Sequence, residues 1–174
     1  MPANIEIKAR VLDPIVLRQR AEQLSDSPVE VMTQVDTFFY TQRGRLKLRE
    51  LGPAPAQLIF YSRPDAAGPK RSDYSIFLTE QPAALKEMLS RALGVRGVVR
   101  KTRLLYLVGQ TRIHLDEVEG LGHFLELEVV LREGQGEDEG QAIAWDVMRR
   151  LGVGAEALLE GAYIDLMEKR ITSV

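Results

Sequence analysis

The chain has 174 residues, with 23 basic and 25 acidic side chains, a formal net charge of −2 and no cysteine. This length predicts one domain over residues 1–174, and the missing cysteine excludes disulfides, thiolate metal sites and a cysteine nucleophile. The balanced charge argues against a nucleic-acid binder, whose usual mark is a strongly basic face. Because no apolar run reaches membrane-spanning length and no secretory signal is apparent, we expect a cytoplasmic protein without membrane or nucleic-acid partners.

The first half of the chain alternates apolar and polar residues in short runs that are typical of strands. A helix is expected directly after the first run, because Asp13 suits its N-cap and Pro14 its first position. A second helix starts near Pro82 and stops at Gly94. The predicted strands are residues 4–11, the two arms of a hairpin over 33–50 around the turn TQRG, and residues 57–65 and 74–78.

The second half continues the alternation and then becomes helical. Its predicted strands are residues 98–108 and two arms within 112–128. Residues 132–141 predict a solvated linker, and the helix that follows stops at Gly152 with Trp145 in the core. Residues 155–170 predict a last helix, broken at Gly161. This order of elements indicates an α+β protein built on an antiparallel sheet.

The polar faces of the predicted strands are almost purely charged. They carry Glu6 and Lys8, Lys47 and Arg49, Arg63, Lys101 and Arg103, Asp116, and Glu126 and Glu128. One interpretation is an open sheet with a wet outer face and cross-strand ion pairs. Another is a closed barrel with the charges inside, where buried cations require anions because unpaired buried charge is costly. Phosphate suits Arg and Lys, and carboxylates beside it would hold Mg²⁺ or Mn²⁺. Alternation alone leaves both interpretations open.

A set of short motifs adds a family resemblance. The segments NIEIK, GRLKLRE, YSRPD, KTR, IHLDEVEGLGHFLELE and LLEGAYIDLM occur in one order between about residue 3 and residue 168. Together they resemble the CYTH superfamily of triphosphate tunnel metalloenzymes, which includes class IV adenylyl cyclases and thiamine triphosphatases. The resemblance implies a closed, eight-stranded antiparallel β-barrel that forms a tunnel, with helices on its flanks.

The resemblance also implies roles for the charged residues. Triphosphate is expected to bind to Lys8, Lys47, Arg49, Arg63, Lys101 and Arg103. Mg²⁺ or Mn²⁺ is expected to bind to Glu6, Asp116, Glu126 and Glu128, and the expected catalytic residues are Glu6, Glu126 and Glu128.

Three residues near these positions need a separate interpretation. Asn4 replaces the first glutamate of the family's N-terminal motif, so a second metal is expected to bind more weakly there. His114 shares a face with Asp116, but the resemblance requires only the aspartate, and a spacer role is favoured over a base or ligand. Tyr163 falls where the family's C-terminal plug begins, which favours a structural role.

The functional expectation is a metal-dependent enzyme that hydrolyses the triphosphate of a small molecule, whether nucleoside, thiamine or inorganic. One alternative is a class IV adenylyl cyclase that converts ATP to cyclic AMP and pyrophosphate. Another is a protein that binds polyphosphate or a nucleotide without turnover, which the asparagine at position 4 keeps open. The oligomeric state is left open, a homodimer included.

Overall fold

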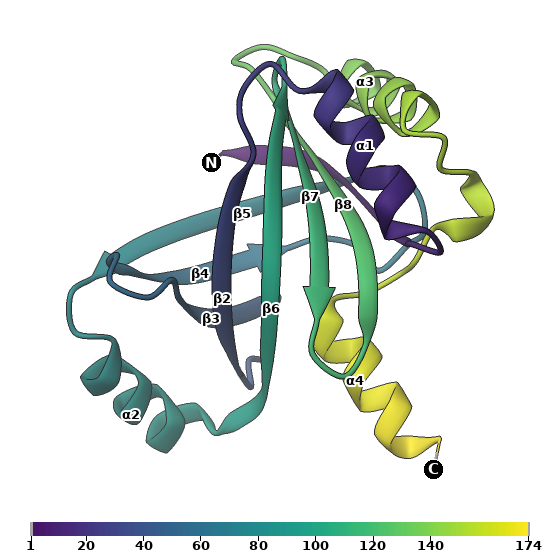
Figure 1. Cartoon of the computed structure of the whole chain (residues 1–174). Coiled ribbons are helices and arrows are strands. Elements are labelled where there is room, and N and C mark those ends of the chain that lie inside the picture. Colours follow the sequence, from purple (N-terminus) through teal and green to yellow (C-terminus); the bar gives the residue numbers. More distant parts are fainter. Residues whose placement is uncertain (1, 174) are drawn as a thin grey trace.

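The computed structural model describes residues 2–173, in which eight antiparallel strands close into a barrel (Figure 1). The strands are β1 (Ala3–Arg10), β2 (Glu30–Phe39), β3 (Arg45–Glu50), β4 (Ala56–Ser62), β5 (Lys70–Thr79), β6 (Val95–Val108), β7 (Thr111–Val118) and β8 (Gly122–Val130). Their order around the barrel is β1-β5-β4-β3-β2-β6-β7-β8, and β8 pairs with β1 to close it. The closed barrel implied by the resemblance is therefore confirmed, and the open wet sheet is excluded.

Helices cover parts of the outer wall and one end. They are α1 (Pro14–Leu24), α2 (Pro82–Leu93), α3 (Glu137–Arg150) and α4 (Tyr163–Thr172), with a short 3-10 turn at Ala155–Ala157. Figure 1 shows α1 and α3 together on one side of the barrel, α2 on the other side, and α4 below β7 and β8. Within the described residues, no helix is long and apolar enough to cross a membrane.

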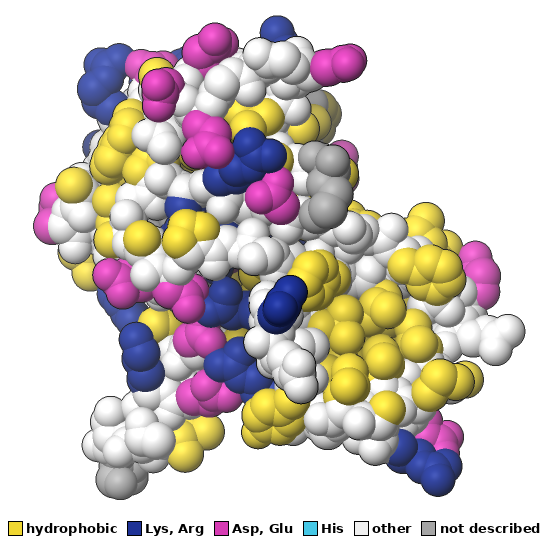
Figure 2. Space-filling view, turned by 180° about the vertical axis from the view of Figure 1, so that it is seen from behind, with side chains coloured by type: hydrophobic (Ala, Val, Ile, Leu, Met, Phe, Trp, Pro, Cys, Tyr) yellow, Lys and Arg dark blue, Asp and Glu magenta, His cyan; other side chains and the backbone are white. Residues whose placement is uncertain are grey.

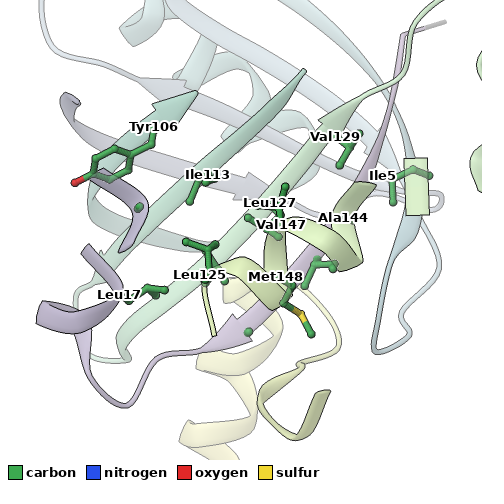
Figure 3. Packing of buried hydrophobic residues seen from close by; sticks show 14 residues of the cluster. Ile5, Leu17, Tyr106, Ile113, Leu125, Leu127, Val129, Ala144, Val147 and Met148 are labelled. Carbon is green, nitrogen blue, oxygen red and sulfur yellow. The ribbon is translucent and has the colours of Figure 1, made fainter. Parts of the chain in front are cut away.

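The largest apolar core lies outside the barrel rather than within it. Ile5, Leu125 and Leu127 point outward and pack under Val147 and Met148 of α3, as Figure 3 shows. All five side chains are buried. Truncating such a residue to alanine typically costs about 2–5 kcal/mol, so the helices are held to the wall mainly by this contact. Because strand side chains alternate between faces, the same strands then present their polar positions to the lumen.

One glycine explains why α3 approaches the barrel so closely. A Cβ atom added at Gly140 would lie 2.6 Å from the Ile5 Cγ1 and 2.6 Å from the Leu131 Cδ2. Real side chains do not tolerate such distances, so the helix needs a residue without a side chain at this point.

A second apolar cluster closes one end of the barrel. Tyr163 and Ile164 at the start of α4 pack against Phe38, Val99 and Phe124 from three strands. A Cβ added at Gly97 would come within 2.5 Å of the Ile164 Cδ1, so α4 lies directly against β6. The C-terminal segment therefore plugs the barrel at this end.

Other parts of the outer wall stay exposed. Figure 2 shows basic and acidic side chains intermixed on the back of the molecule, next to a broad yellow area on the side that carries β5 and α2 in Figure 1. The exposed large apolar residues in these two elements are Ile76, Phe77, Leu78, Met88 and Leu93.

Three predictions about the C-terminal third are wrong. The linker expected over residues 132–141 is shorter, because α3 already begins at Glu137. Trp145 is 40% exposed on α3 and does not belong to the core. Residues 155–160 form no α-helix: Ala155–Ala157 make a 3-10 turn, and the residues after it pair with β1 instead. Leu158 forms an isolated bridge with Ala9, and the Leu159 N–H donates to the Lys8 carbonyl at 2.9 Å. β5 pairs with β1 only up to Glu6, which leaves this carbonyl free for the tail.

Candidate metal and phosphate site

All eight strands contribute side chains to one cavity of about 370 Å³ in the lumen. This volume lies within the range of small-molecule sites in proteins. The basic residues that line it are Lys8, Lys47, Arg49, Arg63, Lys101, Arg103 and Arg112. The acidic residues that line it are Glu6, Asp36, Glu126 and Glu128. Seven cationic side chains against four anionic ones give the lumen an excess of positive charge, which favours an anionic ligand.

The carboxylates gather on one part of the lumen, here called the acidic wall and defined as Glu6, His114, Glu126 and Glu128. Strand register brings them together: Glu126 of β8 lies opposite Lys8 of β1 and His114 of β7, and Glu128 lies opposite Glu6. One ligand atom from each of His114, Glu126 and Glu128 lies within 4.8 Å of the other two. These three residues could therefore contact one ion.

His114 is the member of this wall whose chemistry the sequence did not reveal. Its side chain is buried, and its Nδ1 has no hydrogen-bond partner among the described residues. Burial, reinforced by the charge of Arg103, lowers the pKa of His114 to about 4. The ring is therefore neutral at pH 7, so a nitrogen lone pair is available beside two carboxylates. This set of donors fits a divalent cation.

Glu126 is shared between two cations in this structure. Its Oε1 accepts a hydrogen bond from the Lys8 Nζ at 2.5 Å, and its Oε2 accepts one from the Arg103 Nη2 at 2.6 Å. Burial alone would raise the pKa of this carboxyl, but the charges of Lys8, Lys101 and Arg103 outweigh it and hold the pKa well below the usual range. Glu126 is thus ionised and able to bind metal throughout the neutral range.

Asp116 lies deeper and takes three donors. Arg103 binds it with two hydrogen bonds of 2.7 and 2.6 Å, Lys101 donates at 3.1 Å, and the Tyr163 hydroxyl donates at 2.8 Å. Burial would raise its pKa, but Arg103 and Lys101 lower it instead. Asp116 is therefore the counter-charge of the β6 cations here, and its role as a metal ligand stays a prediction.

A second part of the lumen, here called the basic wall, consists of Lys47 and Arg49 on β3, Lys101 and Arg103 on β6, and Asp36 on β2. Arg49 grips Asp36 with two hydrogen bonds of 2.8 Å, and the Lys47 Nζ donates to the same carboxylate at 2.9 Å. Burial, followed by the repulsion of Arg49, lowers the pKa of Lys47 to about 7. The four cations of this wall face Asp36, Asp116 and Glu126, and Glu126 is shared with Lys8, so the wall retains positive charge.

Sequence reasoning missed Asp36, although a signal for it exists. The turn TQRG of the predicted hairpin is centred between residues 42 and 43. A register about that centre places Asp36 opposite Arg49 and Phe38 opposite Lys47, and the structure has this register. An acid in the middle of one arm, facing a basic arm, thus predicts a buried counter-charge.

The sequence of this chain matches a known protein family over most of its length. The CYTH domain matches residues 2–163. The chain belongs to the CYTH family. Among curated proteins, no match is found.

Solved structures resemble this CYTH protein over most of their length. The PH1012 protein from Pyrococcus horikoshii OT3 shares 27% identity at a TM-score of 0.83, with 94% of this chain and 98% of that chain covered. A conserved hypothetical protein from Pyrococcus furiosus shares 20% identity at a TM-score of 0.84, over 94% and 99%. HpAC1 from Hippeastrum shares 19% identity at a TM-score of 0.63, over 86% and 88%.

The remaining predicted residues lie where the acidic wall of this CYTH barrel meets the plug. Arg63 follows the last residue of β4, forms an ion pair with Glu6 and donates to the Gly161 carbonyl at 2.9 Å. The Lys8 ammonium lies 3.5 Å from the centre of the Tyr163 ring. Asn4 lines the cavity, and its buried Oδ1 has no hydrogen-bond partner in the described chain. The structure thus brings every sequence-predicted site residue to the lumen or, for Asp116, directly behind it.

Proposed function

We propose that this CYTH protein is a divalent-metal-dependent triphosphatase. The observation that carries the proposal is that a single cavity joins a cluster of carboxylates and a neutral histidine to a wall with excess positive charge. A triphosphate with its metal is the kind of ligand that combines both requirements, since its oxygens bind cationic side chains and a hard cation at once. A ligand with anionic groups alone would be repelled by the acidic wall.

The basic wall binds and orients the phosphate chain. Arg49 and Arg103 present planar guanidinium groups that bind phosphate oxygens in pairs, and Lys47 and Lys101 act as point charges. Phosphate oxygens would take over part of the hydrogen bonding that these cations give to Asp36 and Asp116. The charge that develops on the phosphate oxygens during transfer is then stabilised by groups that are already in place, which is the main source of rate in phosphoryl transfer.

The acidic wall holds the metal. Glu126 and Glu128 would supply carboxylate oxygens to Mg²⁺ or Mn²⁺, and Glu6, which faces Glu128 across the β1–β8 pair, would contribute to a second ion. When bound, the ion neutralises phosphate charge and lowers the pKa of the attacking water. Lys8 and Arg63 pair with these acids in this structure, and with a metal on the acids they would contact phosphate. No covalent nucleophile is proposed.

Hydrolysis is preferred to cyclisation because it requires only the triphosphate. A cyclase must also hold the ribose and base so that the 3′-oxygen attacks the α-phosphorus, and no motif in the sequence indicates a base-recognition pocket. HpAC1, one of the proteins with a similar barrel, is described as having a dominant triphosphatase activity. This description supports the choice of hydrolysis.

Product analysis tests the proposal. The purified protein is incubated with Mg²⁺ or Mn²⁺ and with inorganic triphosphate, ATP or thiamine triphosphate, and the products are separated. We expect orthophosphate and the corresponding diphosphate from at least one substrate. Cyclic AMP and pyrophosphate from ATP would instead identify a cyclase. Tight binding of all three compounds without any product would identify a non-catalytic binder.

A further inference from the structure

The nitrogen of His114 occupies an unusual position in the acidic wall. Its side chain is 6% exposed, and its Nδ1 lies 3.9 Å from the Glu126 Oε2 and 3.9 Å from the Glu128 Oε1. Neither distance is short enough for a hydrogen bond. The same nitrogen has no other partner in residues 2–173, so it is a buried polar atom that faces two carboxylates without bonding to them. Buried polar atoms in native proteins nearly always have a partner, and one without it requires an explanation.

The surroundings offer no replacement partner for this nitrogen. Glu126 is bound by Lys8 and Arg103, and Glu128 lies 3.1 Å from the Arg112 Nε. The charged neighbours of His114 are thus occupied with one another. An ion between the three side chains would satisfy the imidazole and both carboxylates together.

The spacing of the three side chains is suitable for a shared ion. Two ligands that are each about 2.1 Å from one ion lie up to about 4.2 Å apart when they stand on opposite sides of it. The two separations of 3.9 Å are within that limit, and the full set of ligand atoms lies within 4.8 Å. Small side-chain adjustments would close the remaining difference.

We propose that His114 is a direct metal ligand and that its nitrogen makes this site select Mn²⁺ over Mg²⁺. The inference rests on the metal site of the proposed function and names the ion that the site prefers. Mg²⁺ is a hard cation that takes oxygen ligands and retains its water shell, so it gains little from an imidazole. Divalent ions of the first transition row accept both imidazole nitrogen and carboxylate oxygen. Mn²⁺ also binds phosphate oxygens readily, which suits a triphosphate substrate.

The first test compares metal binding by three proteins without any substrate. Mn²⁺ affinity is measured by electron paramagnetic resonance of the free ion, and Mg²⁺ affinity is measured by competition. The variants are His114→Gln and the matched control His123→Gln, which removes an exposed histidine at the start of β8. We expect His114→Gln to weaken Mn²⁺ binding about tenfold or more and Mg²⁺ binding less than about threefold. His123→Gln should change neither.

A second measurement needs no substitution at position 114 and so does not depend on how that variant folds. Pulsed electron paramagnetic resonance of Mn²⁺ bound to the wild-type protein should show coupling to a directly bonded imidazole nitrogen. Labelling the histidines with ¹⁵N should change that coupling, and His123→Gln should leave it intact.

The outcomes separate this inference from the proposed function. Tight binding of both metals without nitrogen coupling, or an equal loss of Mn²⁺ and Mg²⁺ affinity in His114→Gln, would overturn the role of His114 alone. If the wild-type protein binds neither ion, the metal site itself is wrong, and the proposed function falls with it. Nitrogen coupling that disappears in His114→Gln together with the Mn²⁺ preference would establish the inference.

Discussion

The acidic wall and the basic wall come from the same strand pattern but differ in how their charges are balanced. On the basic wall, Asp36 neutralises only one of the two cations that grip it, and Asp116 does the same for Lys101 and Arg103. On the acidic wall, carboxylates lie near one another and near a neutral histidine. Each of these carboxylates also has a basic partner, in the pairs Glu6–Arg63, Glu126–Lys8 and Glu128–Arg112. The basic wall thus has more cations than acids, whereas the acidic wall has a basic partner for each acid and adds a neutral nitrogen. The comparison shows that the local ratio of acidic to basic side chains on each wall, rather than the net charge of the chain, indicates which ligand binds to that wall.

The ion pairs of the lumen contribute little to the stability of the fold. Burying an ion pair costs desolvation that its attraction often fails to offset, so such pairs are weak evidence for a stabilising role. The lumen contains at least five such pairs. Their presence is better explained by a role in ligand binding than by a role in folding. The apolar contacts between the barrel and its helices supply the stability that the lumen does not.

Removing a carboxylate from the acidic wall should have the largest effect. We expect Glu128→Gln to lower kcat at least about a hundredfold, because the substrate's charge would then develop without a properly held ion. Glu117→Gln is the matched control, since Glu117 lies on the exposed face of β7. Initial rates are measured with saturating Mn²⁺, and circular dichroism checks the fold. A near-normal rate in Glu128→Gln would show that the metal does not bind to this wall.

Removing a cation from the basic wall should have the second largest effect, a loss of triphosphate affinity. Arg49→Ala should weaken triphosphate binding by about 1.5–3 kcal/mol, the usual value of a hydrogen bond to a charged group, or roughly ten- to a hundredfold. The control is Arg100→Ala, which removes an exposed arginine next to Lys101 on β6. Calorimetric titration with inorganic triphosphate measures both. Equal affinities for Arg49→Ala and the wild type would mean that phosphate does not contact this wall.

Triphosphate affinity should depend on pH through Lys47 of the basic wall. Because its pKa is lowered to about 7, Lys47 is charged below that pH and neutral above it. Triphosphate binding favours the charged form, so affinity should fall up to about fiftyfold from pH 7 to pH 9, because a proton must be taken up on binding. Lys47→Arg keeps its charge and should flatten the profile. Calorimetry at several pH values compares the two proteins, and parallel profiles would contradict this role of Lys47.

The smallest effect is expected at the edge of the acidic wall. Asn4→Glu adds a carboxylate where the Oδ1 of Asn4 is buried without a partner. We expect the Mn²⁺ concentration that gives half-maximal rate to fall a few-fold, because an added opposite charge near an ion is attractive even after desolvation. Asn4→Gln is the neutral control. Superimposable Mn²⁺ titrations for Asn4→Glu and the wild type would show that position 4 does not reach the metals.

The sequence predicted the strands of the barrel and the inward set of charges, because alternation with a period of two is a local property. It could not distinguish a closed barrel from a wet sheet, since closure depends on β8 pairing with β1, about 120 residues apart. The resemblance supplied that step. The sequence favoured a spacer role for His114, because a buried nitrogen without a partner is visible only in three dimensions. The tail at residues 158–159 was predicted to be helical because nothing in its sequence indicates the free Lys8 carbonyl that it binds.

The division of the lumen into two walls is tested most directly by crystals grown with Mn²⁺ and a methylene-bridged triphosphate that resists hydrolysis. Anomalous scattering locates the metal, and the electron density locates the three phosphorus atoms. We predict a manganese peak about 2.1–2.3 Å from oxygens of Glu126 and Glu128, with phosphate oxygens against Arg49 and Lys47. A manganese peak at Asp36, or a phosphate chain bound outside the barrel, would contradict the account.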